Sequence, residues 1–129
     1  MAIKDATIAI DFDGTVVTHA YPEIGEDAGA VPVLKELSGN GCQLILYSMR
    51  HGKLLDQAAE WFRQNGIPLY AVNENPGQKR WTSSPKVHAD LYIDDSSLGC
   101  PLRFIDGVKR PVADWVRIRE QLVKEGFLD

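Results

Sequence analysis

The segment from which the fold can be inferred is Ile8-Ala9-Ile10-Asp11-Phe12-Asp13-Gly14-Thr15, where three apolar residues lead into two carboxylates, a glycine and a threonine. A short apolar run bounded by turn-forming residues is typical of a buried parallel strand. Open α/β sheets bind their ligands outside the carboxyl ends of such strands. The segment therefore predicts a central strand that carries chemically active groups at its carboxyl end.

Asp11 and Asp13 are two residues apart, so their side chains leave the same face of an extended backbone while Phe12 points to the other face. Neighbouring carboxylates repel each other unless a cation neutralises them. Mg²⁺ does so and keeps water ligands that a phosphorylated substrate can replace. The pair therefore indicates a metal site. Taken alone, the motif also fits an ordinary turn with solvated acids, because Asp and Gly are common turn residues.

Length and composition indicate one globular domain. The chain has 129 residues, 44% of them hydrophobic, so we expect a single domain over residues 1–129 with its own core. The net charge of -4 argues against broad nucleic-acid or membrane binding. No apolar run is long enough for a transmembrane helix and no secretory signal pattern is seen, so we expect a cytoplasmic protein. Two cysteines, Cys42 and Cys100, make a poor disulfide framework and are expected to be reduced.

Strand-like and helix-like segments alternate along the rest of the chain. Apolar runs that favour strands lie at 42–47, 69–72, 91–93 and 102–105, and helical spacing of apolar residues lies at 31–37 and 54–62. Pro111 is expected to open a last helix that covers one face of the sheet. Its apolar residues are Val112, Trp115, Val116, Leu122 and Val123. The alternation predicts an α/β fold with a three-layer, Rossmann-like parallel sheet.

Polar groups suited to phosphate chemistry follow three of the predicted strands. Asp11 and Asp13 follow the first, Ser48 the second, and Asp94 and Asp95 the strand at 91–93. Any one of these residues could simply cap the helix that follows it. Because a parallel sheet brings all of its carboxyl ends to one edge, their joint occurrence indicates a shared site.

This ordered set resembles the haloacid dehalogenase (HAD) superfamily of phosphotransferases. The resemblance covers Ile8 to Asp95 and rests on Asp11-Phe12-Asp13-Gly14-Thr15, Ser48, Lys86 and Asp94-Asp95. Members are mostly Mg²⁺-dependent phosphatases that work through an aspartyl-phosphate. The resemblance implies a HAD-like fold without a cap domain, because 16–30 holds only a flap and 49–85 is used up by a helix, a strand and a loop. An open site of this kind accepts large substrates or is covered by a neighbouring subunit.

The resemblance also implies a role for each motif residue. Asp11 is the expected nucleophile and a Mg²⁺ ligand, and Asp13 is the expected general acid and base, with its backbone carbonyl on the metal. Of the late acids, Asp95 is favoured as the direct metal ligand and Asp94 as the partner of Lys86, although their order is left open. Residues expected to bind the phosphorylated group are Ser48, Met49, Arg50 and Lys86, with Lys79 and His88 as alternatives to Lys86.

Other residues near these motifs carry two interpretations. His19 and Tyr21 either line the entrance to the site or belong to an ordinary surface loop. Trp81 follows two cations, Lys79 and Arg80, which is compatible with stacking on a nucleotide, but packing of Trp81 against the core is the preferred interpretation.

The main functional hypothesis is a Mg²⁺-dependent phosphomonoesterase with a small or macromolecular phosphorylated substrate. One alternative is a non-catalytic phosphate- or metal-binding regulatory module of the same fold, and another is a phosphatase for nucleic-acid ends, which the negative net charge disfavours. A receiver-like signalling domain is disfavoured by motif order, because the middle strands end at Ser48 and Val72 rather than at an aspartate. The substrate and any homo-oligomeric assembly are left open.

Overall fold

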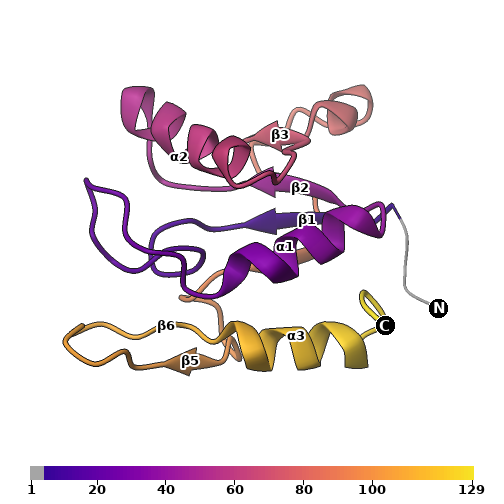
Figure 1. Cartoon of the computed structure of the whole chain (residues 1–129). Coiled ribbons are helices and arrows are strands. Elements are labelled where there is room, and N and C mark those ends of the chain that lie inside the picture. Colours follow the sequence, from indigo (N-terminus) through magenta and orange to yellow (C-terminus); the bar gives the residue numbers. More distant parts are fainter. Residues whose placement is uncertain (1–4) are drawn as a thin grey trace.

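A four-stranded, all-parallel sheet lies at the centre of the computed structural model, which describes residues 5–129 (Figure 1). The strand order is β3-β2-β1-β4. The bounds are β1 Thr7–Ile10, β2 Gln43–Leu46, β3 Ala71–Val72 and β4 Leu91–Ile93. The predicted α/β class with a Rossmann-like parallel sheet is confirmed, and residues 5–129 contain no cap domain. The first four residues of the predicted domain lie outside the described part of the chain.

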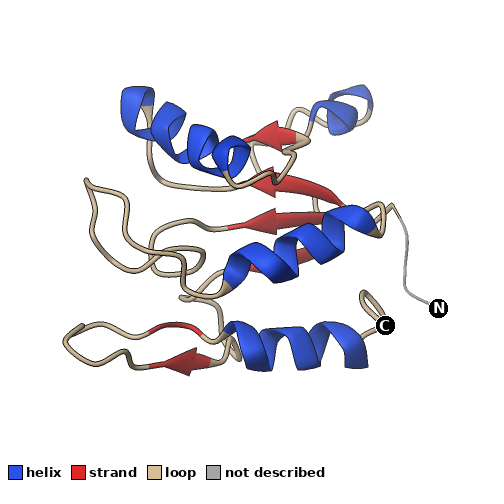
Figure 2. Ribbon diagram, in the orientation of Figure 1, coloured by secondary structure: helices blue, strands red, loops and turns tan. Residues whose placement is uncertain are grey.

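Three α-helices pack on one face of the sheet (Figures 1 and 2). They are α1 Ala30–Gly39, α2 Gly52–Gln64 and α3 Trp115–Lys124. Right-handed crossovers from β1 to β2 and from β2 to β3 run in the same direction, so α1 and α2 must lie on the same face. The return from β3 to β4 runs the opposite way and crosses the other face with residues 73–90, which include the 3₁₀-helix η1, Pro76–Arg80. The α-helices thus cover one face of the sheet, and residues 73–90 cover part of the other, where Ile45 and Val87 are buried.

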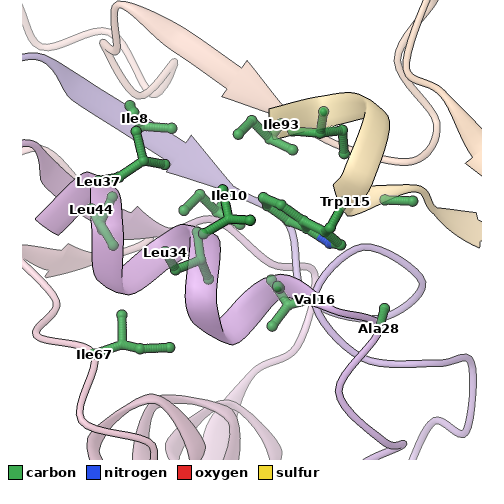
Figure 3. Close-up of a cluster of buried hydrophobic side chains, with 14 of the residues drawn as sticks. Ile8, Ile10, Val16, Ala28, Leu34, Leu37, Leu44, Ile67, Ile93 and Trp115 are labelled. Carbon is green, nitrogen blue, oxygen red and sulfur yellow. The ribbon is translucent and has the colours of Figure 1, made fainter. Parts of the chain in front are cut away.

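The core lies between the sheet and the three helices. Figure 3 shows Ile8 and Ile10 of β1 packed with Leu34 of α1 and Trp115 of α3. All four residues of β1 are buried, which explains the unbroken apolar run from Ile8 to Ile10 in the sequence. Because Ile8 and Ile10 fix β1 against the helices, the residues that follow Ile10 are held at the carboxyl edge of the sheet.

The prediction for the last helix is wrong at its start. Pro111 does not open a helix; it precedes β6, Val112–Ala113, which pairs antiparallel with β5, Leu102–Arg103, outside the central sheet. The helix begins at Trp115 because the Asp114 side chain accepts hydrogen bonds from the first free N–H groups of α3. Its buried residues are Trp115, Ile118 and Leu122, whereas two residues predicted to face the core, Val116 and Val123, are exposed.

Trp81 also departs from the prediction. Its side chain is 65% exposed instead of packed against the core, and its ring makes an edge contact with the ring of His88 at a centroid distance of 5.5 Å. The predicted strand at 91–93 is confirmed, while β2 and β3 are shorter than predicted. Within residues 5–129, none of the helices combines the length and the apolar character needed to cross a membrane.

Candidate metal and phosphate site

Three carboxylates meet where β1 and β4 end side by side. Ile10 pairs with Ile93 in parallel register, and the N–H of Asp11 continues the ladder by donating to the carbonyl of Ile93 at 2.9 Å. Asp11 and the pair Asp94–Asp95 therefore leave the sheet at the same level. One carboxylate oxygen from each of Asp11, Asp94 and Asp95 lies within 4.8 Å of the others. Three hard oxygen donors at this spacing match the ligands that Mg²⁺ and Ca²⁺ take in proteins.

The hydroxyl of Thr15 ties this cluster together. Thr15 Oγ1 lies 2.7 Å from Asp11 Oδ2 and 3.1 Å from Asp95 Oδ1, and it accepts the N–H of Asp95 at 2.9 Å. Thr15 is fully buried, and its carbonyl accepts the indole N–H of Trp115 at 2.7 Å. Thr15 therefore orients two of the three acids, Asp11 and Asp95.

The pKa of Asp11 is raised by its surroundings. Burial raises the pKa of Asp11 from 3.8 to about 7; the hydrogen bond from Thr15 opposes this shift, and the charges of Asp94 and Asp95 add to it. Without a cation, the carboxyl of Asp11 therefore holds a proton over much of the range in which an ordinary aspartate is ionised. Binding of a cation to the cluster must release that proton.

This shift predicts how the stability of the metal-free protein depends on pH. The folded state keeps a proton on Asp11 up to about pH 7, whereas the unfolded chain loses it near 3.8. The protonated Asp11 thus stabilises the folded state fully below about pH 4, and this stabilisation is lost as pH rises through about 7, on the order of 4 kcal/mol in total. We expect Asp11→Asn to remove this slope. Urea unfolding of the wild type and Asp11→Asn in chelator from pH 4.5 to 8 measures this slope. If the free energy of unfolding changes with pH equally in both proteins, Asp11 is not the group responsible.

A flap formed by residues 16–28 reaches over the acids. Backbone hydrogen bonds close it into a hairpin, in line with the predicted flap. His19 Nε2 lies 3.4 Å from Asp95 Oδ2 and 3.2 Å from the carbonyl oxygen of Pro111, so a hydrogen on this nitrogen can serve both acceptors. His19 is therefore part of the site. Tyr21, the other flap residue considered, is exposed and contacts Arg50 instead of the acids.

Gly14 allows the His19 ring to approach. Gly14 has φ 83°, a left-handed conformation, and a β-carbon there would overlap the His19 ring and lie 2.8 Å from Asp95 Oδ2. The absence of a side chain at this turn is what lets the flap reach the acids.

Gly14→Ala is therefore expected to destabilise the fold and displace His19 from Asp95, because backbone strain and steric overlap act together. Gly39→Ala is the control, since Gly39 is at the end of α1 with no atom near its missing β-carbon. Thermal unfolding of both variants, followed by circular dichroism, makes the comparison. Equal melting temperatures would show that the turn tolerates a side chain.

Asp13 does not join the three acids; it forms an ion pair with Arg50. Arg50 Nε donates to Asp13 Oδ2 and Nη2 to Oδ1, both at 2.8 Å, and the Arg50 side chain is 1% exposed. Its Nη2 also donates to the carbonyl of Glu23 at 2.8 Å, and Nη1 donates at 3.3 Å to those of Pro22 and Leu54. The five N–H groups of the guanidinium are thus all used within the protein. This geometry holds the flap tip to the start of α2 and leaves Arg50 no donor for a substrate, contrary to its predicted role.

Within residues 5–129, the side chains of the remaining predicted residues make no hydrogen bond or ion pair with the three acids. Ser48 Oγ accepts the backbone N–H of Arg50 at 3.0 Å, and the Asn73 side chain holds both the N–H and the carbonyl of Ser48. Met49 is almost fully exposed. The ammonium of Lys86 lies 5.9 Å from the Tyr92 ring centroid, and within residues 5–129 it makes no ion pair. Their predicted roles in phosphate binding remain predictions.

The alternatives to Lys86 are also engaged elsewhere. Lys79 pairs with Glu74 at 3.0 Å, and the ring of His88 contacts Trp81. The two cysteines are free thiols, and burial together with the charges of Asp95 and Asp94 raises the pKa of Cys100 to about 11. The Cys100 thiol is therefore un-ionised at neutral pH and a poor metal ligand.

Comparison with known protein families and with curated proteins gives no match. A solved structure does match, namely the conserved protein coded by a locus of Bacteroides thetaiotaomicron. The two sequences are 40% identical, the match covers 95% of this chain and 93% of the other, and the TM-score is 0.77. The similarity thus extends over nearly the full length of both proteins and includes the fold that positions the acids. The chain belongs to the same protein family as this conserved Bacteroides thetaiotaomicron protein.

Proposed function

We propose that the protein is a Mg²⁺-dependent phosphomonoesterase that acts through an aspartyl-phosphate on Asp11. The observation that carries the proposal is the convergence of Asp11, Asp94 and Asp95 within 4.8 Å at the carboxyl edge of the sheet. The motif order that resembles the HAD superfamily supports it. A structural ion-pair network would balance these negative charges with cations, whereas the only basic side chain within ion-pair distance of the three acids, among residues 5–129, is His19.

The chemistry follows from what each group can do. Asp11, Asp94 and Asp95 would hold Mg²⁺, whose charge reduces the repulsion between an anionic phosphate and an anionic nucleophile. A carboxylate oxygen of Asp11 forms a bond to phosphorus as the bond from phosphorus to the ester oxygen breaks, and the departing alkoxide takes a proton. Water then cleaves the aspartyl-phosphate, which releases inorganic phosphate and restores the carboxylate of Asp11.

Asp13 would serve as the acid and base of these two steps, and its ion pair limits how. With both oxygens held by Arg50, the carboxylate of Asp13 is an acceptor, which suits activation of the hydrolytic water. Protonation of the leaving group requires Asp13 to carry a proton and so to loosen from Arg50.

The same ion pair favours a second candidate function, a non-catalytic module that binds a metal ion or a phosphate group. If the contact between Asp13 and Arg50 is permanent, no acid is available for the leaving group and the three carboxylates would serve binding alone.

Phosphate release from a panel of phosphomonoesters tests both functions. The panel includes sugar phosphates, nucleotides, aryl phosphates, a phosphopeptide and an end-phosphorylated oligonucleotide, each with Mg²⁺ and with chelator. The phosphomonoesterase predicts metal-dependent release from at least one class. Calorimetric Mg²⁺ binding without release from any class would support the binding module and overturn the enzyme.

A further inference from the structure

The sheet face opposite the α-helices carries two tyrosines beside the acids. Side chains alternate along a strand, so Ala9 and Asp11 share this face of β1. Tyr92 lies opposite Ala9 in the parallel register and shares the face as well. Tyr47 follows β2, and its N–H donates to the carbonyl of Ile10 at 2.8 Å. Tyr47 is thus next to Asp11, one strand spacing or about 4.8 Å away.

The rings of Tyr47 and Tyr92 meet over Ala9, with centroids 6.3 Å apart and planes at 50°. Tyr47 and Tyr92 thus form a tyrosine pair. Ala9 is 1% exposed although its side chain is a single methyl group. A small residue on the central strand leaves the space into which rings from both neighbouring strands can lean. The result is one aromatic surface that begins beside the carboxylate of Asp11.

This aromatic surface is open where the rest of the face is covered. Ile45 and Val87 are buried on this side of the sheet, whereas Tyr47 is 38% and Tyr92 37% exposed. The Tyr92 hydroxyl donates to the carbonyl of Val87, which fixes its ring. Lys86, whose ammonium is 5.9 Å from the Tyr92 ring centroid, adds a positive charge at the border of the surface. Aromatic rings, a cation and a phosphoryl-accepting acid thus lie together.

We propose that the tyrosine pair binds the leaving group, so that the substrate is a phosphomonoester with a planar aromatic or heteroaromatic ring on its alcohol side. This inference rests on the proposed function, which places the phosphoryl group at Asp11. Stacking of a ring on an aromatic side chain contributes about 1–3 kcal/mol, or roughly 5- to 150-fold in affinity. An aliphatic ester such as glycerol phosphate has no ring to stack.

The test compares substrates that share the phosphate and differ in the alcohol. Phenyl phosphate, a nucleoside 5′-monophosphate and glycerol 3-phosphate are assayed with Mg²⁺ for the wild type, Tyr47→Leu and the control Tyr70→Leu. Tyr70 has a similar exposure, 40%, and precedes β3. We expect Tyr47→Leu to raise KM at least 5-fold for one or both aromatic substrates, with little change in kcat or for glycerol 3-phosphate. The two aromatic substrates separate an aryl ring from a nucleobase.

Binding of non-hydrolysable analogues keeps this inference separate from the proposed function. Calorimetry with Mg²⁺ should show that phenylphosphonate binds more tightly than methylphosphonate, and that Tyr47→Leu removes the difference. Tyr92→Phe keeps the ring and should keep the difference. If no substrate is hydrolysed but this difference in affinity is present, the proposed phosphatase activity is wrong and binding of aromatic rings by the tyrosine pair is supported. Equal affinity for both phosphonates, or equal effects of Tyr47→Leu and Tyr70→Leu on that affinity, would show that the tyrosine pair does not bind the ring.

Discussion

Replacing Asp11 with asparagine is expected to lower metal-dependent phosphate release by about 10³-fold or more without unfolding the protein. The amide matches the carboxylate in size but is not a nucleophile toward phosphorus, so the covalent route is closed. The substitution also removes one of three acidic oxygens from the cluster, which should weaken Mg²⁺ binding. Both effects act on the same step and reinforce each other.

Stability separates this result from misfolding. Because burial raises the pKa of Asp11 to about 7, the metal-free variant should be at least as stable as the wild type at pH 8, where the wild type has an ionised Asp11. Asp56→Asn serves as the control, since Asp56 is an exposed aspartate on α2. Phosphate release and thermal unfolding are measured for both variants. Activity of Asp11→Asn within tenfold of the wild type would exclude Asp11 as the nucleophile.

The strand ends that build the site could be read from the sequence because their signals are local. A strand buried on both faces is mostly apolar, as β1 is from Ile8 to Ile10, and its carboxyl end is marked by the first acids. The carboxyl end of β4 is marked in the same way, because Asp94 and Asp95 follow the strand directly, although Tyr92 within it is exposed. Parallel pairing then brings Asp11 to those two acids without further information, since neighbouring strands end at the same edge.

The contacts that the sequence could not supply join residues far apart in the chain. Asp13 and Arg50 are separated by 37 positions, and the basic residue two places after Ser48 looked as suited to a substrate as to an internal ion pair. Pro111 has the same ambiguity, because a proline fits both the first turn of a helix and the start of an edge strand. Residues 112–113 form a strand because they pair antiparallel with β5, Leu102–Arg103.

Arg50→Lys is expected to destabilise the protein by about 3 kcal/mol, as an internal ion pair that loses its geometry does. A lysine has three donors on one nitrogen and cannot replace a planar fork that serves Asp13 and the carbonyls of Pro22, Glu23 and Leu54. The guanidinium also lies 5.2 Å from the ring centroids of Phe12 and Tyr21, contacts that an ammonium fits less well. The flap should loosen, which denaturant unfolding and amide exchange in residues 16–28 would report.

Arg119→Lys is the matched control because Arg119 also forms a bidentate pair, with Glu36, at 2.9 and 2.6 Å. Both side chains of that pair are about 40% exposed, so solvent replaces most of what the substitution removes and the free energy of unfolding should hardly change. Because both pairs are bidentate, the burial of the Arg50 pair then explains the difference in the free energy of unfolding. If Arg50→Lys is as stable as Arg119→Lys but raises KM, Arg50 binds substrate as first predicted. If Arg50→Lys lowers stability and activity together, Arg50 holds the flap and orients Asp13.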